Sequence, residues 1–385
     1  MGPLKGIRVL DLSQVLAGPF GAMMLGDLGA DVVKIEPPHG DVTRNIPGVQ
    51  RNGVPVGIVN YNRSKRGIVI DFKKPAGAEV FLKMAEKADA VVQNFRPGVV
   101  DKLGVGYEAT SKRNRRIVYC SMAGYGFTGP DADKPAYDPI IQGKAGAMES
   151  QRTQGRPRVI KNAVADKITG MTAAFSIVSA LLAARESGKG QHIQIAMIDA
   201  LAYFLLSDTM IHQTFLPHTP GLRPPVTTAE PFETADGFIT IAPLTDKHWT
   251  ALLKAVGHSE WFEGDEPRLE RTKRSGRNLI QLFKTQPSAH WLPLIEQADV
   301  PCGRLNTYDT IFDDPQFIAN QTFFEYEHPR AGRVRGVRPP AQFSQTKPEL
   351  KHHAPDLGGS TDEILAEYGF SSAEIGNLRA ERVVG

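Results

Sequence analysis

The chain has 385 residues, a length that predicts two or three domains with sizeable cores. Apolar residues make up 41% and charged residues 23%, so the composition excludes a largely disordered chain and a coiled coil. Lys and Arg together number 45 and Asp and Glu 42, and a net charge of +3 does not by itself indicate a nucleic-acid partner.

Cysteine and histidine usage argues against a metal site. The two cysteines, Cys120 and Cys302, lie too far apart in the sequence to indicate a disulfide framework or a metal-ligand pair, and the ten histidines show no metal spacing. The first residues show no signal-peptide pattern, and the uncharged run 168–184 is short for a bilayer span. We therefore expect a cytoplasmic protein with no metal, no membrane partner and no nucleic-acid partner.

Short β-rich runs alternate with helical stretches over the first 200 residues. This rhythm predicts a parallel sheet with helices on its faces, and ligands of such sheets bind beyond the carboxyl ends of the strands. The predicted strands are 7–11, 31–36, 68–71, 90–93, 116–121 and 191–198, and the predicted helices are 19–28, 76–87, 99–103, 162–186 and 199–212.

A second domain is predicted after residue 216. Five prolines between 217 and 231 predict an extended linker and a domain boundary. Beyond them the sequence predicts a smaller α+β domain that ends near Phe324, followed by an extended stretch at 334–345. The predicted elements are a strand at 238–242 and helices at 247–256, 271–284, 289–297, 362–368 and 372–380.

One carboxylate, Asp166, lies near the start of the long predicted helix 162–186. A helix N-terminus favours negative charge, so we expect Asp166 to be ionised. Small neighbours at Ala163, Ala165 and Gly170 are expected to leave room for a ligand, although an acid that merely complements the helix dipole is the alternative. The helical period also predicts one buried apolar stripe, made of Ile168, Met171, Phe175, Val178 and Leu182.

Two further motifs are compatible with binding. The segment 124–129 matches the dinucleotide pattern G-x-G-x-x-G, but prolines and aspartates follow it where a helix is required, so a ligand-facing glycine loop is favoured over an NAD site. Lys65, Arg66 and Lys73 border a predicted strand, where a polyphosphate could use their charge and donors; solvated surface is the alternative.

Many short segments, together covering nearly the whole chain, are similar to the class III coenzyme A-transferases, the family of formyl-CoA transferase and carnitine CoA-transferase. They include 6–12, 17–19, 28–36, 40–44, 62–66, 92–98, 124–126, 165–166, 188–191, 234–237, 300–303 and 313–315. The resemblance implies an α/β fold with a Rossmann-like large domain made from both termini, a smaller α+β domain between them, and an interlocked homodimer. It places residues 1–216 in the large domain and 217–324 in the linker and small domain, with 325–385 returning to the large domain.

The same resemblance implies a reaction and a site. The family moves CoA from an acyl-CoA donor to a carboxylic acid, through an aspartyl anhydride and an aspartyl-CoA thioester, and its nucleophile falls on Asp166. CoA and acyl-CoA are then substrates, and no permanently bound cofactor is expected. The family's CoA-binding positions fall near Val15, Lys73, Asn94, Phe95, Lys102, Leu103 and Tyr137, to which we add Arg66 and Arg96 for their charge.

Two alternatives stay open: an acyl-CoA racemase or isomerase, and a non-catalytic CoA-binding protein. The related α-methylacyl-CoA racemases use a histidine that falls on Tyr137, and a phenol with a pKa near 10 is a poor base at neutral pH. Leu16 stands where formyl-CoA transferase has a glutamine, which argues against specificity for oxalate or formate.

Overall fold

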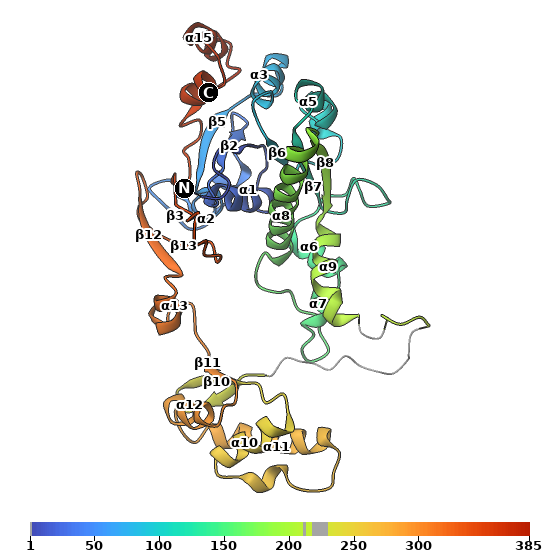
Figure 1. Cartoon of the computed structure of the whole chain (residues 1–385), viewed down its shortest axis with the longest axis vertical. Helices are drawn as coiled ribbons and strands as arrows, with labels where there is room; N and C mark the ends of the chain where they lie inside the picture. Colours follow the sequence, from blue (N-terminus) through green and yellow to red (C-terminus); the bar gives the residue numbers. More distant parts are fainter. Residues whose placement is uncertain (1, 211–212, 218–229) are drawn as a thin grey trace. The chain divides into compact units, whose positions relative to one another are not determined.

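The computed structural model describes residues 2–210, 213–217 and 230–385, which form two compact units (Figure 1). The large unit comprises Met1–Thr214 and Phe323–Gly385, and the small unit comprises Phe215–Thr322. The boundaries expected at 217 and 324 lie close to these positions. Most of the predicted linker, 218–229, and the last two residues of the predicted helix 199–212 lie outside the described residues.

The large unit is built on a six-stranded sheet in the order β5-β2-β1-β6-β7-β8. Every neighbouring pair is parallel, which confirms the predicted parallel sheet. The chain runs from β1 outward to β2 and β5, then returns to the other side of β1 with β6, so the order reverses between β1 and β6. The strands are β1 (Arg8–Asp11), β2 (Asp31–Glu36), β5 (Lys65–Val69), β6 (Ala90–Gln93), β7 (Val118–Ala123) and β8 (Gln191–Ala196).

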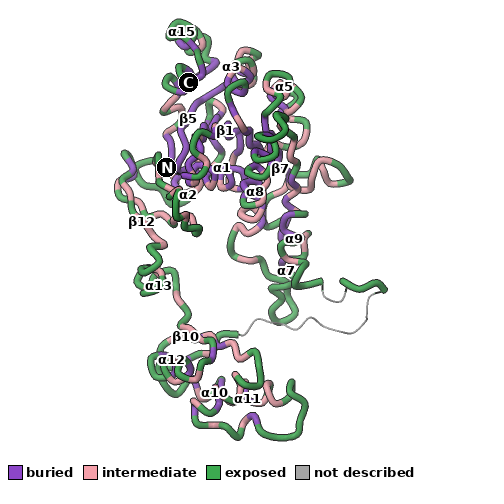
Figure 2. The backbone as a smooth tube through the Cα atoms, viewed as in Figure 1, coloured by how far each residue is buried: buried purple, intermediate pink, exposed green. Residues whose placement is uncertain are grey.

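Helices cover both faces of this sheet because successive strand residues point to opposite sides. On β1, Val9 packs toward α1 (Ala17–Asp27) and α8 (Val164–Ser187), whereas Leu10 packs toward α3 (Pro75–Ala85). The C-terminal helices α14 (Thr361–Glu367) and α15 (Ser372–Ala380) join the Leu10 face, so the end of the chain belongs to the large unit. Buried residues follow the strands in Figure 2.

The remaining elements of the large unit surround the sheet. They are η1 (Val42–Arg44), β3 (Gln50–Arg51), β4 (Val54–Pro55), α2 (Val56–Asn62), α4 (Val99–Lys102), α5 (Tyr107–Arg113), α6 (Asp138–Lys144), α7 (Ala147–Ser150), α9 (Met197–Thr209), β12 (Phe323–His328) and β13 (Gly332–Val337). The last two form an antiparallel hairpin. The predicted extended stretch 334–345 is therefore a strand only as far as Val337.

The small unit has an antiparallel three-stranded sheet packed on helices, an α+β arrangement. Its core joins Ile239 of the sheet to Leu252, Leu279, Phe283 and Trp291 of the helices. The elements are β9 (Phe232–Thr234), β10 (Gly237–Ile241), α10 (Asp246–Ala255), η2 (Ser259–Phe262), α11 (Arg268–Phe283), α12 (Ser288–Gln297), β11 (Cys302–Arg304), η3 (Ile311–Asp313) and α13 (Pro315–Ala319).

The predicted apolar stripe of α8 is wrong: its large side chains face outward, with Phe175 76% and Leu182 62% exposed. The buried face consists mainly of Gly and Ala, because α8 packs closely against α1. An added Cβ at Gly170 would lie 2.5 Å from the carbonyl oxygen of Ala17. Among the described residues, α8 is the one helix whose length and apolar composition would allow it to cross a membrane; 44% of its most apolar stretch is buried within the protein.

Candidate active site

A cavity of about 290 Å³ opens at the carboxyl ends of β1, β6 and β7, where the strand order reverses. This is the position at which open parallel sheets bind ligands. The loops after β1 and β6 form one wall, and the first turn of α8 contributes Asp166. Six of the predicted site residues line this cavity: Val15, Asn94, Phe95, Arg96, Tyr137 and Asp166.

A second cavity, of about 570 Å³, has Gln14 and Phe95 in common with the first. It contains two more predicted residues, Lys73 and Leu103, and Lys102 is exposed on the neighbouring turn. Its other walls are largely apolar and come from Ile35, Pro37, Pro38 and Phe72. His39 and Asp71 add two polar groups to these walls, and the two cavities adjoin at Gln14 and Phe95.

Asp166 lies in the first turn of α8, yet the expectation that the helix N-terminus keeps it ionised is wrong. Burial raises the pKa of Asp166 to about 7, and the negative charge of Asp138 adds to the effect. Oδ2 of Asp138 accepts hydrogen bonds from the backbone N–H groups of Ala165, at 2.7 Å, and Asp166, at 3.2 Å. A second carboxylate thus occupies the positive end of the helix.

Small residues beside Asp166 serve helix packing rather than ligand binding. Ala165 is fully buried, and Gly170 contacts the backbone of Ala17 and Gly21 in α1. The space beside Asp166 comes instead from the ends of β6 and β7 and from the loop that precedes α6. The close α1–α8 contact still matters for the site, because Ala17 and Asp166 line the same cavity.

The cations divide into two groups. Lys65 is fully buried and donates to Asp11, Asn62 and the carbonyl oxygen of Pro19, and burial lowers its pKa to about 8 against the opposing charge of Asp11. Arg66 pairs with Asp31, Glu363 and Glu367. Neither lines the two cavities, so the interpretation of Lys65 and Arg66 as phosphate ligands is wrong: their charges are already neutralised inside the fold.

Arg96 and Lys73 behave differently. Arg96 lines the Asp166 cavity and Lys73 lines the larger one. Both are exposed, and within the described part of the chain neither side chain makes an ion pair. Lys134, a further cation of the Asp166 cavity, is paired with Asp131 at 2.6 Å. Among the Lys and Arg residues described as lining the two cavities, Arg96 and Lys73 are therefore available to an anionic ligand.

The loop after β1 has a strained backbone conformation that the sequence motifs did not reveal. Val15 has a φ of 68°, a left-handed conformation that is strained for a β-branched residue. The side chain of Asn94 receives a hydrogen bond from Gln14 N at 2.8 Å and donates one to Gln14 O at 2.7 Å. The amide of Asn94 is thus engaged with this loop. In the sequence, this contact is indicated only by the position of residues 14 and 94, each of which follows a predicted strand.

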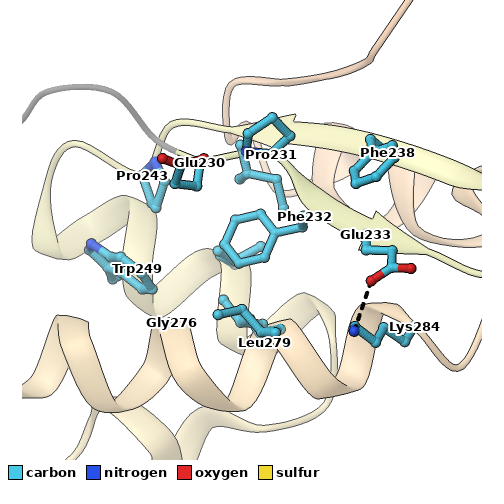
Figure 3. Close-up of a pocket in the computed structure, with 13 residues that line it drawn as sticks. Glu230, Pro231, Phe232, Glu233, Phe238, Pro243, Trp249, Gly276, Leu279 and Lys284 are labelled. Atoms are coloured by element: carbon cyan, nitrogen blue, oxygen red, sulfur yellow. Dashed lines mark ion pairs between the residues drawn. The ribbon is translucent and has the colours of Figure 1, made fainter. Parts of the chain in front are cut away.

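A further cavity, of about 440 Å³, lies in the small unit (Figure 3). Its walls are mainly apolar and include Phe232, Trp249 and Leu279. At its edge Glu233 and Lys284 pair at 2.8 Å and neutralise each other. In the described residues, no group of three or more His, Cys, Asp or Glu side chains has the arrangement of a metal site.

Comparisons with known proteins identify the family of the chain. The model of CoA-transferase family III matches residues 4–361. An acetyl-CoA:oxalate CoA-transferase from Acetobacter aceti is 38% identical over 97% of each chain, and a succinate–glutarate CoA-transferase from Agrobacterium fabrum is 33% identical over 95% of each. A crystal structure of a CAIB/BAIF family protein from Brucella suis superposes with a TM-score of 0.83 at 31% identity, covering 95% of this chain and 99% of the other. The chain therefore belongs to CoA-transferase family III and is a CoA-transferase.

Proposed function

We propose that the protein moves CoA between two carboxylic acids and that the Asp166 carboxylate is its nucleophile. The observation that carries this proposal is the setting of Asp166. Its carboxylate lies in a partly enclosed cavity, receives no hydrogen bond from any described side chain, and has a pKa raised to about 7. A desolvated carboxylate without hydrogen-bond partners is a better nucleophile than a solvated one.

CoA fits the two cavities in one orientation. Its adenosine end occupies the larger, apolar cavity, where Phe95 and Leu103 can pack against the base. Lys73 and Lys102 bind phosphate oxygens, since both are exposed cations at or beside the larger cavity. The pantetheine arm then passes Gln14 and Phe95, which line both cavities, and carries the thioester toward Asp166. Tyr137 lies at the exposed side of the smaller cavity.

The reaction proceeds by exchange at two carbonyl carbons. An oxygen of Asp166 attacks the acyl carbon of the donor thioester, the C–S bond breaks, and CoA thiolate leaves a mixed anhydride. The thiolate attacks the Asp166 carbonyl carbon, forms the aspartyl-CoA thioester and expels the donor acid. An acceptor carboxylate attacks this thioester and forms a second anhydride. The returning thiolate then takes the acceptor's acyl group and releases the Asp166 carboxylate.

Each attack places negative charge on a carbonyl oxygen, which needs positioned donors. The glycine-rich stretch 123–129 is the candidate, because Ala123 and Gly124 line the Asp166 cavity at the end of β7. Restricted access of water also matters, since anhydrides and thioesters hydrolyse. The cavity is lined on several sides by apolar groups, including Met122, Pro135 and Met197.

A short dicarboxylic acid is the acceptor class that we favour. The names of relatives include succinate, glutarate, mesaconate and oxalate, all dicarboxylates. In this chain Arg96 lines the cavity without an ion-pair partner among the described residues, so it can recognise a second carboxylate once the CoA phosphates lie further out.

A homodimer is part of the same proposal. The outward faces of α8 and α9 carry large apolar side chains, with Phe175 76% and Tyr203 90% exposed. Exposed apolar residues on two packed helices are typical of an association surface. A second copy of this chain is the partner that the interlocked arrangement of the family implies. The cytoplasmic location and the absence of membrane and nucleic-acid partners stay predictions.

Incubation with succinyl-CoA and a panel of mono- and dicarboxylic acids tests the activity directly. Mass spectrometry should detect a new acyl-CoA with at least one dicarboxylate, and Asp166→Ala should abolish transfer while CoA binding is retained. An Asp166→Ala variant that transfers CoA at the parent rate would refute the mechanism. Exchange of the α-hydrogen with deuterated solvent in the absence of an acceptor would favour the racemase, and CoA binding without turnover would favour a silent binding protein.

A further inference from the structure

The loop that separates the two cavities is held almost entirely by side chains. Residues 13–15 follow β1, and Gln14 lines both cavities. Ser13 N donates to Oδ1 of Asp11 at 2.9 Å, and Gln14 exchanges its two hydrogen bonds with Asn94. Nζ of Lys34 donates a hydrogen bond to Ser13 O at 3.0 Å, and Val15 N donates one to Oδ1 of Asp41 at 3.2 Å. Every backbone donor and acceptor from Ser13 N to Val15 N is thereby paired with a side chain.

Lys34 and Asp41 form an ion pair of 2.9 Å, and both side chains are fully buried. Burial alone would raise the pKa of Asp41, but the charge of Lys34 outweighs it and holds this pKa at about 2. Burial would likewise lower the pKa of Lys34, and the charges of Asp41, Asp11 and Glu36 raise it instead. Both groups are therefore charged at neutral pH.

A buried ion pair gives little net stability, because desolvation of the two charges offsets their attraction. This pair is nonetheless kept in place by further bonds. Asp41 N donates a hydrogen bond to Glu36 at 2.8 Å. The guanidinium of Arg44 donates two hydrogen bonds to the same carboxylate, at 2.6 and 2.7 Å. Oδ1 of Asp41 also receives Thr43 N at 2.9 Å. These contacts fix the direction of both Asp41 oxygens, one toward Lys34 and one toward Val15.

The conformation that the pair supports is strained. Val15 is β-branched and has a φ of 68°, which persists only when surrounding contacts over-determine it. Such strain is typical of ligand sites. The Lys34–Asp41 pair holds the loop by hydrogen bonds at Ser13 O and Val15 N. Asn94, which follows β6, holds it by its hydrogen bond with Gln14 N.

We propose that Lys34 and Asp41 are positioning residues for CoA binding, which hold the 13–15 loop in its strained conformation between the two cavities. This inference rests on the proposed CoA-transfer function and deepens it. Neither residue lines a cavity, so neither touches the substrate. Their loss should affect acyl-CoA binding more than the chemical step.

The double variant Lys34→Met/Asp41→Leu removes both charges together, so that no buried charge is left without its partner. Its acyl-CoA KM should rise about tenfold or more, while kcat stays within about threefold of the parent. Asp41→Asn keeps an oxygen for Val15 N and leaves the charge of Lys34 opposed by Asp11 and Glu36, so it should show a smaller rise and serves as a second, independent variant if the double variant fails to fold. Adding Val15→Gly to the double variant should restore part of the KM, because glycine adopts a positive φ without strain.

The matched control is Arg63→Met/Asp27→Leu, since this second buried pair, at 2.6 Å, lies away from both cavities. The control should change thermal stability without changing the KM. A folded Lys34→Met/Asp41→Leu or Asp41→Asn variant with the parental KM overturns the inference, and so does an equal KM rise in the control. If the parent itself does not transfer CoA, the proposed function fails rather than this inference alone.

Discussion

Asp138 and Asp166 meet at the N-terminus of α8, where Oδ2 of Asp138 accepts the backbone N–H of Asp166 at 3.2 Å. The helix end that would stabilise the Asp166 charge is therefore occupied by another carboxylate. Asp138 is buried and also receives Nε2 of Gln142 at 2.5 Å, so its position is fixed. Asp138 thereby orients α8 and, through its charge, helps burial to keep the pKa of Asp166 high.

The first prediction concerns the pH dependence of activity. The proposed mechanism requires the ionised carboxylate of Asp166, whose pKa is raised to about 7 by burial and by Asp138. The value of kcat/KM for the acyl-CoA should therefore rise with pH through about 7 and level off above it. Initial rates between pH 5 and 9 measure this limb. A limb centred near pH 4 would contradict the assignment of this carboxylate.

Asp138→Asn should move that limb to lower pH, because it removes the like charge while its amide oxygen can still accept the two N–H groups. Gln142→Met is the control: it removes the hydrogen bonds of the Gln142 amide to Asp138 and to the backbone of Ile160 and Asn162, and it keeps the Asp138 charge. The control should leave the midpoint of the limb unchanged. Equal shifts in the two variants would show that local packing, and not charge, sets the midpoint.

The second prediction concerns stability. A carboxyl whose pKa is raised on folding favours the folded state while it is protonated, and this contribution is lost as the pH rises toward the folded pKa of about 7. Asp166→Asn should therefore stabilise the protein at pH 8, by on the order of 2 kcal/mol after allowance for partial exposure. The gain should be clearly smaller at pH 5. Thermal unfolding at both pH values tests this, and a gain independent of pH would contradict it.

The third prediction concerns the contact of α1 with α8. In Gly170→Ala the new Cβ would lie 2.5 Å from the carbonyl oxygen of Ala17, so the helices must separate. We expect destabilisation of about 1–3 kcal/mol and a loss of activity, because Ala17 and Asp166 line one cavity. Gly376→Ala in α15 is the control, since nothing lies within 4 Å of its added Cβ. That variant should be neutral or slightly more stable.

The fourth prediction concerns association. Phe175→Asp and Tyr203→Asp place charges on the exposed apolar faces of α8 and α9 and should weaken a homodimer by at least tenfold. Light scattering coupled to size-exclusion chromatography measures the mass of parent and variants. Ile318→Asp, a comparably exposed apolar site on the small unit, is the control and should leave the mass unchanged. A parent that is monomeric at micromolar concentration would refute the dimer.

Much of the large unit was predictable, because short β-rich runs that alternate with helices follow directly from a parallel sheet covered on both faces. The stripe on α8 misled for a physical reason. Helical periodicity identifies an apolar face but not its partner, and here the face toward the core is made of Gly and Ala so that α1 can approach. Phe175 and Leu182 belong to the outer surface.

At the site, motif positions placed Asp166, Val15 and Phe95 in one cavity, but they did not reveal charge pairing. Arg66 reads as a candidate phosphate ligand in the sequence, and only the fold brings Glu363 and Glu367 to it from almost 300 residues away. The pKa of Asp166 was equally out of reach, because it depends first on burial in the folded chain and then on the charge of Asp138, which approaches from α6.

Oxygen exchange tests the central claim most directly. In the proposed reaction each transfer leaves one oxygen of the acceptor acid on the Asp166 carboxylate. Turnover with an acceptor labelled in both oxygens with ¹⁸O, followed by digestion and mass spectrometry, should therefore show the label in the peptide that contains Asp166, and nowhere else in the chain. Active enzyme that transfers CoA with no ¹⁸O at Asp166 would contradict the account.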